Sequence, residues 1–169
     1  YDTAHLISVL HAFKAKYQLE TLVVVADAGL LSKENILLLE QGNYEYILGA
    51  RIKATNKKVK EKILALTLKN GESSSIDIDN DTKLIVTYSE ARARKDMHNR
   101  ERGIMKLENQ LKTGKLTKAS INNRGYNKFL EIENEIKITL STEKIEEDKK
   151  WDGLKGYITN TRLSTEEVL

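Results

Sequence analysis

The stretch TLVVVADAGLLS, residues 21–32, carries the strongest fold signal in this chain. Residues 21–26 form a short, continuous and β-branched apolar run, which is typical of a strand buried on both faces. The run stops at Asp27, which is followed by the small pair Ala28 and Gly29. The pattern therefore predicts a buried strand that delivers Asp27 to its carboxyl end.

The residues that follow predict a second strand beside the first. Ser32 can cap a helix over residues 33–41, and Gly42 can end it before an apolar strand over residues 44–52. Two strands joined by a helix of this length form a right-handed crossover in a parallel sheet. Ligands of open α/β sheets bind at the carboxyl ends of such strands. We therefore expect a functional site at this edge of the sheet.

Further elements follow from apolar periodicity, caps and turns. The expected helices cover residues 3–17 after a cap at Asp2, 56–66, 90–112, 142–148 and a start at the capping box of Ser164 and Glu167. The expected strands cover residues 75–79, 84–88, two stretches within 125–140, and 154–159. The apolar faces predicted for the first and longest helices consist of Leu6, Val9, Leu10, Phe13 and Tyr17, and of Ala93, Met97, Ile104, Leu107 and Leu111.

Composition excludes several classes of protein and site. With 40% hydrophobic and 31% charged residues over 169 positions, the chain can bury a core. It has no cysteine, which excludes disulfides, thiolate nucleophiles and cysteine-based metal centres. No apolar run approaches the roughly 20 residues of a membrane span, and no glycine-rich phosphate loop appears. We expect a cytoplasmic protein with no membrane partner and no nucleotide cofactor.

Charge is unevenly distributed although the net charge is only +3. Residues 51–70 carry seven basic side chains against Glu61 alone, whereas residues 131–148 carry seven acidic side chains against two lysines. Within the helix expected at 90–112, basic residues recur at helical spacing as a stripe of Arg92, Lys95, Arg102 and Lys106. The stripe is either a solvated face or a surface for DNA phosphates, and Arg51 and Lys53 are further candidates for such contacts.

Asp27 has two interpretations at this level. A strand-ending Asp-x-Gly commonly accepts backbone N–H groups in an Asx turn, and a carboxylate at this edge can also bind a metal ion. One carboxylate alone does not make a magnesium site. His5, His11 and His98 lack the spacing of metal ligands, so we interpret them as surface or helix-face residues.

Four motifs in order along the chain resemble the DDE domain of bacterial insertion-sequence transposases. The resemblance is to members whose ribonuclease H-like core is interrupted by a β-rich insertion. The motifs are VVADAGLLS (24–32) with Asn35, YILGAR (46–51), LIVTYS (84–89) with Arg92, Ala93, Lys95 and Asp96, and Asp152-Gly153 with YITN (157–160).

This resemblance implies that Asp27 is the second acid of a catalytic triad and a ligand of Mg²⁺ or Mn²⁺. The first acid would precede residue 1 and the third would follow residue 169, so we expect an internal fragment that is inactive alone. Asp2 and Asp152 are not assigned to the triad. The whole protein would cleave and join DNA in transposition, with double-stranded transposon ends and target DNA as partners in the bacterial cytoplasm. The alternative is a non-catalytic nucleic-acid-binding or protein-interaction module that uses helix 90–112.

The resulting fold class is mixed α/β, a partial ribonuclease H-like core interrupted by an α+β insertion. We expect the core at residues 1–52, the insertion at 53–150, and a return strand with the start of the catalytic helix at 151–169. In a ribonuclease H-like sheet the strand that ends at Asp27 follows three earlier strands. Without them its edge would be unpaired, and unpaired edges favour association, so we expect a homodimer.

Overall fold

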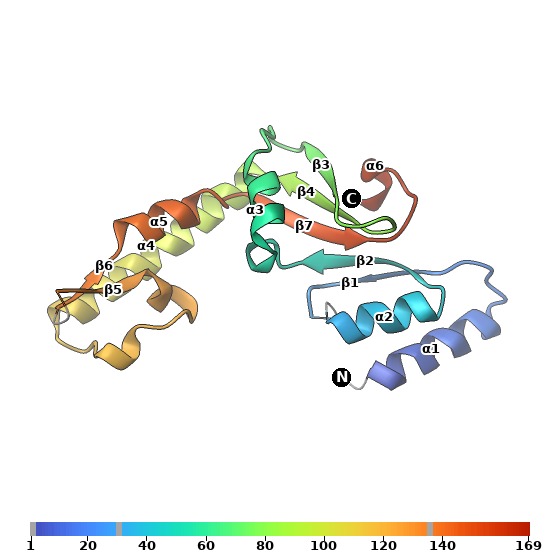
Figure 1. The fold of residues 1–169 in the computed structure, drawn as a ribbon, viewed down its shortest axis with the longest axis horizontal. Coiled ribbons are helices and arrows are strands. Elements are labelled where there is room, and N and C mark those ends of the chain that lie inside the picture. The colour runs from blue at the N-terminus through green and yellow to red at the C-terminus, as the bar shows by residue number, and fades with distance from the viewer. Residues whose placement is uncertain (1–2, 30–31, 135–136) are drawn as a thin grey trace. The chain divides into compact units, whose positions relative to one another are not determined.

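The computed structural model describes residues 3–29, 32–134 and 137–169. The chain folds into two compact units (Figure 1). One holds the residues up to Tyr88 together with Lys155–Leu169, and the other holds Ser89–Leu154. Asp2, the expected cap of the first helix, lies outside the described residues.

The first unit is built on a five-stranded mixed sheet in the order β1-β2-β7-β4-β3. Its strands are β1 (Val23–Ala26), β2 (Glu45–Ala50), β3 (Ser73–Asp77), β4 (Lys83–Tyr88) and β7 (Leu154–Thr159). β1 and β2 are parallel, whereas β2 pairs antiparallel with β7, and β3 with β4. Together with six α-helices among the described residues, this sheet confirms the mixed α/β class.

Two helices cover one face of the sheet beside β1 and β2. They are α1 (Thr3–Lys16) and α2 (Lys33–Gln41), and Figure 1 shows α2 running along the two strands. α2 begins at Ser32, whose hydroxyl accepts the Asn35 N–H at 3.1 Å. The buried cluster under these helices consists of Val24, Leu39, Tyr44, Tyr46 and Leu48, with Ile7, Leu10 and Ile36 packed against it.

The apolar face predicted for α1 is only partly correct. Leu10 packs against the cluster as expected, together with Ile7. Val9, Phe13 and Tyr17 instead keep 50%, 47% and 54% of their surfaces exposed, and the side chain of Leu6 is outside the described part. The helix is apolar on two sides, so periodicity alone does not select the buried one.

α3 (Lys57–Leu64) follows a short 3₁₀ turn, Ile52–Ala54, and buries Val59 and Ile63. α6 (Thr165–Val168) begins with the predicted capping box, in which Ser164 and Glu167 bond each other's backbone N–H groups. None of the helices, over the residues described, has the length and apolar character required to cross a membrane.

The second unit is built around the long helix α4 (Glu90–Lys112). The other elements are two 3₁₀ turns, Lys118–Ser120 and Gly125–Phe129, the hairpin β5 (Leu130–Glu133) and β6 (Lys137–Leu140), and α5 (Thr142–Lys149). Leu107, Phe129 and Leu130 form its buried cluster. The two strands expected within 125–140 are thus present, but residues 125–129 are helical because the chain first turns back onto α4.

The boundaries of the two units differ from the expected 1–52, 53–150 and 151–169. β7 lies between β2 and β4 in one sheet, so the β3–β4 hairpin extends the core sheet and does not belong to the separate unit. The second unit starts at Ser89, where α4 leaves the sheet, and ends at Leu154, where β7 enters it.

β1 lies at one edge of the five-stranded sheet, as expected. Among the described residues it pairs only with β2. The prediction that the strand is buried on both faces is wrong, because Val25 keeps 72% of its surface exposed. The homodimer expected from this edge stays a prediction.

Candidate functional site

Asp27 lies at the carboxyl end of β1, where the sequence places it. The parallel register pairs Ala26 with Leu48, so Asp27 is level with the end of β2. Its side chain is exposed, and its Oδ1 accepts the Gly29 N–H at 2.7 Å in an Asx turn. The turn fixes one carboxylate oxygen and points the group into solvent at the edge where α/β sheets bind ligands.

Gly49 of β2 lets the end of β1 approach closely. A Cβ at position 49 would lie 2.9 Å from the backbone nitrogen of Ala28 and 3.5 Å from Cα of Asp27, closer to that nitrogen than Cβ atoms normally come. A side chain here would push Asp27 away from β2. Gly49 therefore helps to set the position of the Asp27 backbone, a role that the sequence motif YILGAR alone does not reveal.

Arg51 and Lys53 lie just beyond the carboxyl end of β2. Because β1 and β2 are parallel, their carboxyl ends meet at one edge of the sheet, which brings Arg51 to the same edge as Asp27. Both basic side chains are exposed. Their role as DNA contacts stays a prediction.

The other four predicted DNA contacts belong to the second unit. Arg92, Lys95, Arg102 and Lys106 are all exposed on α4, as the stripe predicts. Arg92 forms a long ion pair with Asp96, with 3.8 Å between Nε and Oδ2.

The sequence interpretation missed Arg100, which is the buried cation of α4. Only 5% of its surface is exposed, and its two terminal nitrogens donate to the two carboxylate oxygens of Asp152 at 2.6 and 2.5 Å. Met97, expected on the buried face, is 45% exposed instead. The inward face of α4 thus includes a charged residue, so a search for apolar periodicity cannot find it.

The described residues contain no group of three or more histidine, aspartate or glutamate side chains that could hold a metal ion. Mg²⁺ takes near-octahedral oxygen coordination, typically from one or two carboxylates together with waters and phosphate oxygens. Asp27 fits as one such ligand, because its Oδ2 makes no hydrogen bond to the described residues. Any further carboxylates must come from elsewhere.

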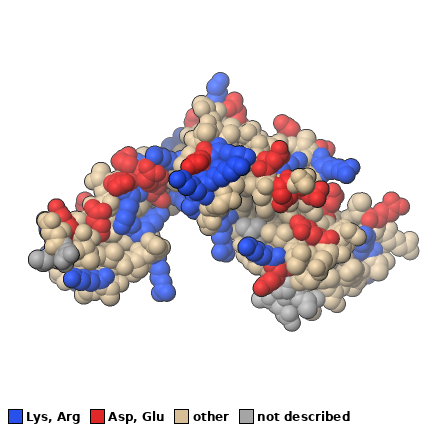
Figure 2. Space-filling model, viewed as in Figure 1, with Lys and Arg blue, Asp and Glu red and all other residues tan. Residues whose placement is uncertain are grey.

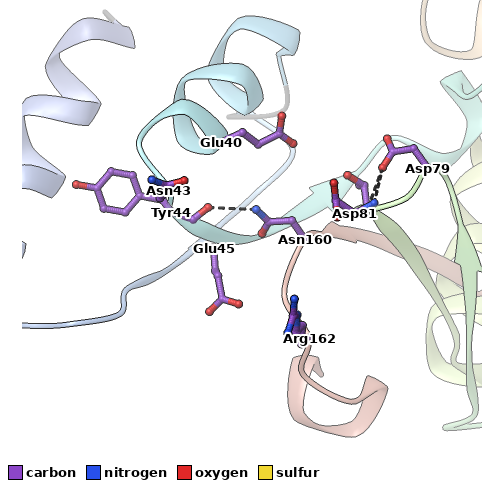
Figure 3. A pocket seen from close by; sticks show the side chains of 9 residues that line it. Glu40, Asn43, Tyr44, Glu45, Asp79, Asp81, Asn160 and Arg162 are labelled. Atoms are coloured by element: carbon purple, nitrogen blue, oxygen red, sulfur yellow. Dashed lines mark hydrogen bonds between the residues drawn. The ribbon is translucent and has the colours of Figure 1, made fainter.

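A polar pocket of about 600 Å³ lies at the opposite end of β2 from Asp27 (Figure 3). Its lining is mainly acidic and amide side chains, with Arg162 as a cation: Glu40, Asn43, Tyr44, Glu45, Asp79, Asp81, Thr82, Asn160 and Arg162. Asp79 is engaged within its own turn, since its Oδ1 accepts the N–H groups of Asp81 and Thr82 at 3.1 and 2.8 Å. No local sequence pattern predicts this pocket.

Asn160, from the fourth resembling motif, has a structural role beside the pocket. Its Oδ1 accepts the Tyr46 N–H at 2.8 Å, and its Nδ2 donates to the Tyr44 carbonyl at 3.2 Å, as Figure 3 shows for the second bond. The amide thereby continues the pairing of β2 and β7 by one further pair of bonds.

Tyr46 contributes a pH-dependent part of the stability. Burial, with a smaller contribution from Glu40, raises the pKa of its phenol from 10.0 to about 12, and the hydroxyl donates to Glu40 Oε1 at 2.9 Å. The folded protein holds this proton more tightly than the unfolded chain. The stabilisation is therefore complete below pH 10 and lost as the pH rises from 10 to 12, by roughly 2–3 kcal/mol.

The measurement compares wild type with Tyr46→Phe in urea unfolding at about pH 9 and about pH 12. All other ionisable side chains are the same in both proteins, so the difference isolates Tyr46. Wild type should lose roughly 2–3 kcal/mol more than the variant. An equal loss in both proteins would contradict the assignment.

His11, interpreted as a helix-face residue, shares a hydrogen bond with the Tyr44 hydroxyl through its Nδ1 at 3.1 Å. The bond joins α1 to the start of β2, so one ring nitrogen of His11 has a structural hydrogen-bond partner.

Comparison with known proteins finds no family model, no curated protein and no solved structure that matches this chain.

Proposed function

We propose that this chain is part of the catalytic region of a DDE transposase, in which Asp27 is one of three acids. The observation that carries the proposal is the position of Asp27 at the carboxyl end of the first of two parallel neighbouring strands. The choice of the transposase family rests on the four colinear motifs of the sequence. The close approach permitted by Gly49 adds a backbone position that is fixed relative to β2.

The metal expected at Asp27 is Mg²⁺ or Mn²⁺, completed by two acids from segments that flank this one in the longer protein. When bound, such ions activate the attacking oxygen and stabilise the leaving oxygen in phosphodiester displacement. Asp27 contributes a carboxylate held by the Gly29 N–H. Arg51 and Lys53 at the same edge supply positive charge for DNA phosphates.

Asp27→Ala, made in the longer protein that includes the flanking segments, tests the proposal. We expect Mg²⁺-dependent DNA strand cleavage to fall on the order of 10³-fold or more, since members of a catalytic group act as a unit. Glu34→Ala is the matched control, because Glu34 is an exposed carboxylate in the first turn of α2. Retained cleavage in Asp27→Ala would remove Asp27 from the active site.

The alternative function is a non-catalytic nucleic-acid-binding or protein-interaction module. The exposed basic stripe of α4 favours it. Under this alternative the longer protein binds DNA but shows no metal-dependent cleavage, with or without Asp27, so the same experiment separates the two functions.

A further inference from the structure

Tyr126 is seated directly on the backbone of α4. It belongs to the turn Gly125–Phe129, and its ring lies against Gly103, which is buried in the helix. A Cβ at position 103 would overlap ring atoms of Tyr126, so the glycine is what makes room for the ring. Tyr126 nevertheless keeps 40% of its surface exposed. The contact fixes the ring on the helix and leaves part of it in solvent.

Two basic residues of α4 lie close to Gly103 along the helix. Lys106 follows Gly103 by three positions, and residues at that spacing are neighbours on a helix surface. Arg102 immediately precedes the glycine. Both side chains are exposed, and neither forms an ion pair with the residues that the structure describes. Tyr126 is thus an aromatic group at the margin of the basic stripe.

The chain between α4 and β5 adds positive charge without any acid. Residues 109–130 contain five basic residues and no aspartate or glutamate. Lys128 is paired with Asp148 at 2.7 Å. The other four basic side chains are exposed: Lys112, Lys115, Lys118 and Arg124. The segment is ordered by its own bonds, including those of Asn122 Nδ2 to the carbonyls of Ala119 and Ser120.

Three acidic residues of α4 lie away from the basic stripe. Glu90, Glu101 and Glu108 of α4 recur at a spacing that puts them on one side of the helix, away from the stripe. Figure 2 shows other acidic side chains of the unit gathered over α5. Asp96 and Asp148 pair with Arg92 and Lys128, whereas Arg102, Lys106 and the exposed cations of residues 112–124 form no ion pair with the described residues.

We propose that Arg102, Lys106 and Tyr126, with the exposed cations of residues 112–124, bind single-stranded DNA. An unpaired base stacks on the Tyr126 ring while Arg102 and Lys106 contact the flanking phosphates. Surfaces for single strands combine these two parts, a basic track and aromatic rings. A duplex keeps its bases stacked inside and would use only the cations. The choice of DNA rests on the proposed function, whereas the surface itself does not.

The test is fluorescence anisotropy with a labelled oligothymidylate of about 12 nucleotides, a length within the site sizes of such surfaces. Tyr126→Leu keeps an apolar cover on Gly103 but removes the aromatic face, and it should weaken binding about 5- to 150-fold, as expected for one stacked base. Tyr126→Phe should retain wild-type affinity. Tyr17→Leu is the matched control, since Tyr17 is an exposed tyrosine directly after α1, and it should change nothing.

Two further arms identify the ligand. A DNA duplex should bind equally well to wild type and Tyr126→Leu, whereas Arg102→Gln combined with Lys106→Gln should weaken both ligands and lower the salt dependence. Unfolding curves confirm that each variant is folded. Unchanged oligothymidylate affinity in folded Tyr126→Leu, absence of binding in wild type, or tighter binding of oligouridylate would each overturn the proposal. None of these outcomes bears on cleavage at Asp27, which is measured separately.

Discussion

Arg100→Met should destabilise the unit Ser89–Leu154 by about 3–5 kcal/mol, the usual effect of removing one partner of a buried ion pair. Arg100 donates two hydrogen bonds to Asp152, and its Nη1 lies 3.6 Å from Oδ2 of Asp148. The bond with Asp152 raises the pKa of Arg100 above its usual value, so the guanidinium stays charged. Methionine fills much of its space but leaves the Asp152 carboxylate without its cation.

The ion pair of Arg100 and Asp152 lies where the first and last residues of the unit come together. Nearby, the Ser89 N–H donates to the Gly153 carbonyl at 3.1 Å, and the Gly153 N–H donates to Asp96 at 3.2 Å. The chain enters the unit at Ser89 and leaves it after Leu154. Arg100 thus links α4 to the chain segment at Asp152 and Gly153, next to Ser89.

Trp151, the single tryptophan of the chain, adjoins Asp152 and reports the unfolding of this unit by its fluorescence. Arg102→Met is the control, an exposed arginine on the same helix, and should change stability by no more than about 0.5 kcal/mol. Arg100→Lys should recover only part of the loss because lysine lacks the two-nitrogen fork. Adding Asp152→Leu to Arg100→Met should restore stability in part. A loss below about 1 kcal/mol in Arg100→Met would contradict this account.

Gly156→Val should destabilise the first unit by about 3 kcal/mol, at the upper end of the range for overpacking. Gly156 lies on β7, within the five-stranded sheet, opposite Ala50 of β2. A Cβ there would overlap Cγ2 of the buried Ile52 and lie 3.3 Å from Cδ1 of Leu84. Neither neighbour can move without disturbing the core.

Hydrogen exchange of the backbone amides of this sheet follows the unit, with Lys155→Val as a control at an exposed position of the same strand. Ile52→Ala removes the overlapping methyl group. The double variant should therefore be more stable than the sum of the two single losses predicts, by about 1 kcal/mol or more. Strict additivity would show that the overlap is not the cause.

Many element boundaries were predictable because their signals are local. α2 at Lys33–Gln41, α4 at Glu90–Lys112 and β7 at Leu154–Thr159 lie where the sequence predicts them. Ser32 and Ser89 cap the two helices through their hydroxyl groups, as expected. Caps and stop signals act within a few residues, so they can be recognised without the tertiary structure.

The candidate site was predictable in part. The position of Asp27 follows from a strand, a helix and a second strand that are adjacent in sequence, and the exposure of the α4 stripe follows from its spacing. The roles of Gly49, Gly103 and Arg100 do not, because each depends on a partner distant in the sequence: Asp27–Ala28, Tyr126 and Asp152. Catalysis and DNA binding stay predictions.

Local sequence patterns were enough to predict the mixed α/β class, the parallel β1–β2 pair and most helix limits. Short-range capping, chain reversal and apolar period specify these features. Only the tertiary structure decided that the β3–β4 hairpin joins the core sheet through β7, which side of α1 is buried, and that α4 buries a charge in place of Met97. These outcomes depend on contacts between residues far apart along the chain, such as Arg100 and Asp152, and no local pattern specifies which distant partner a side chain will meet.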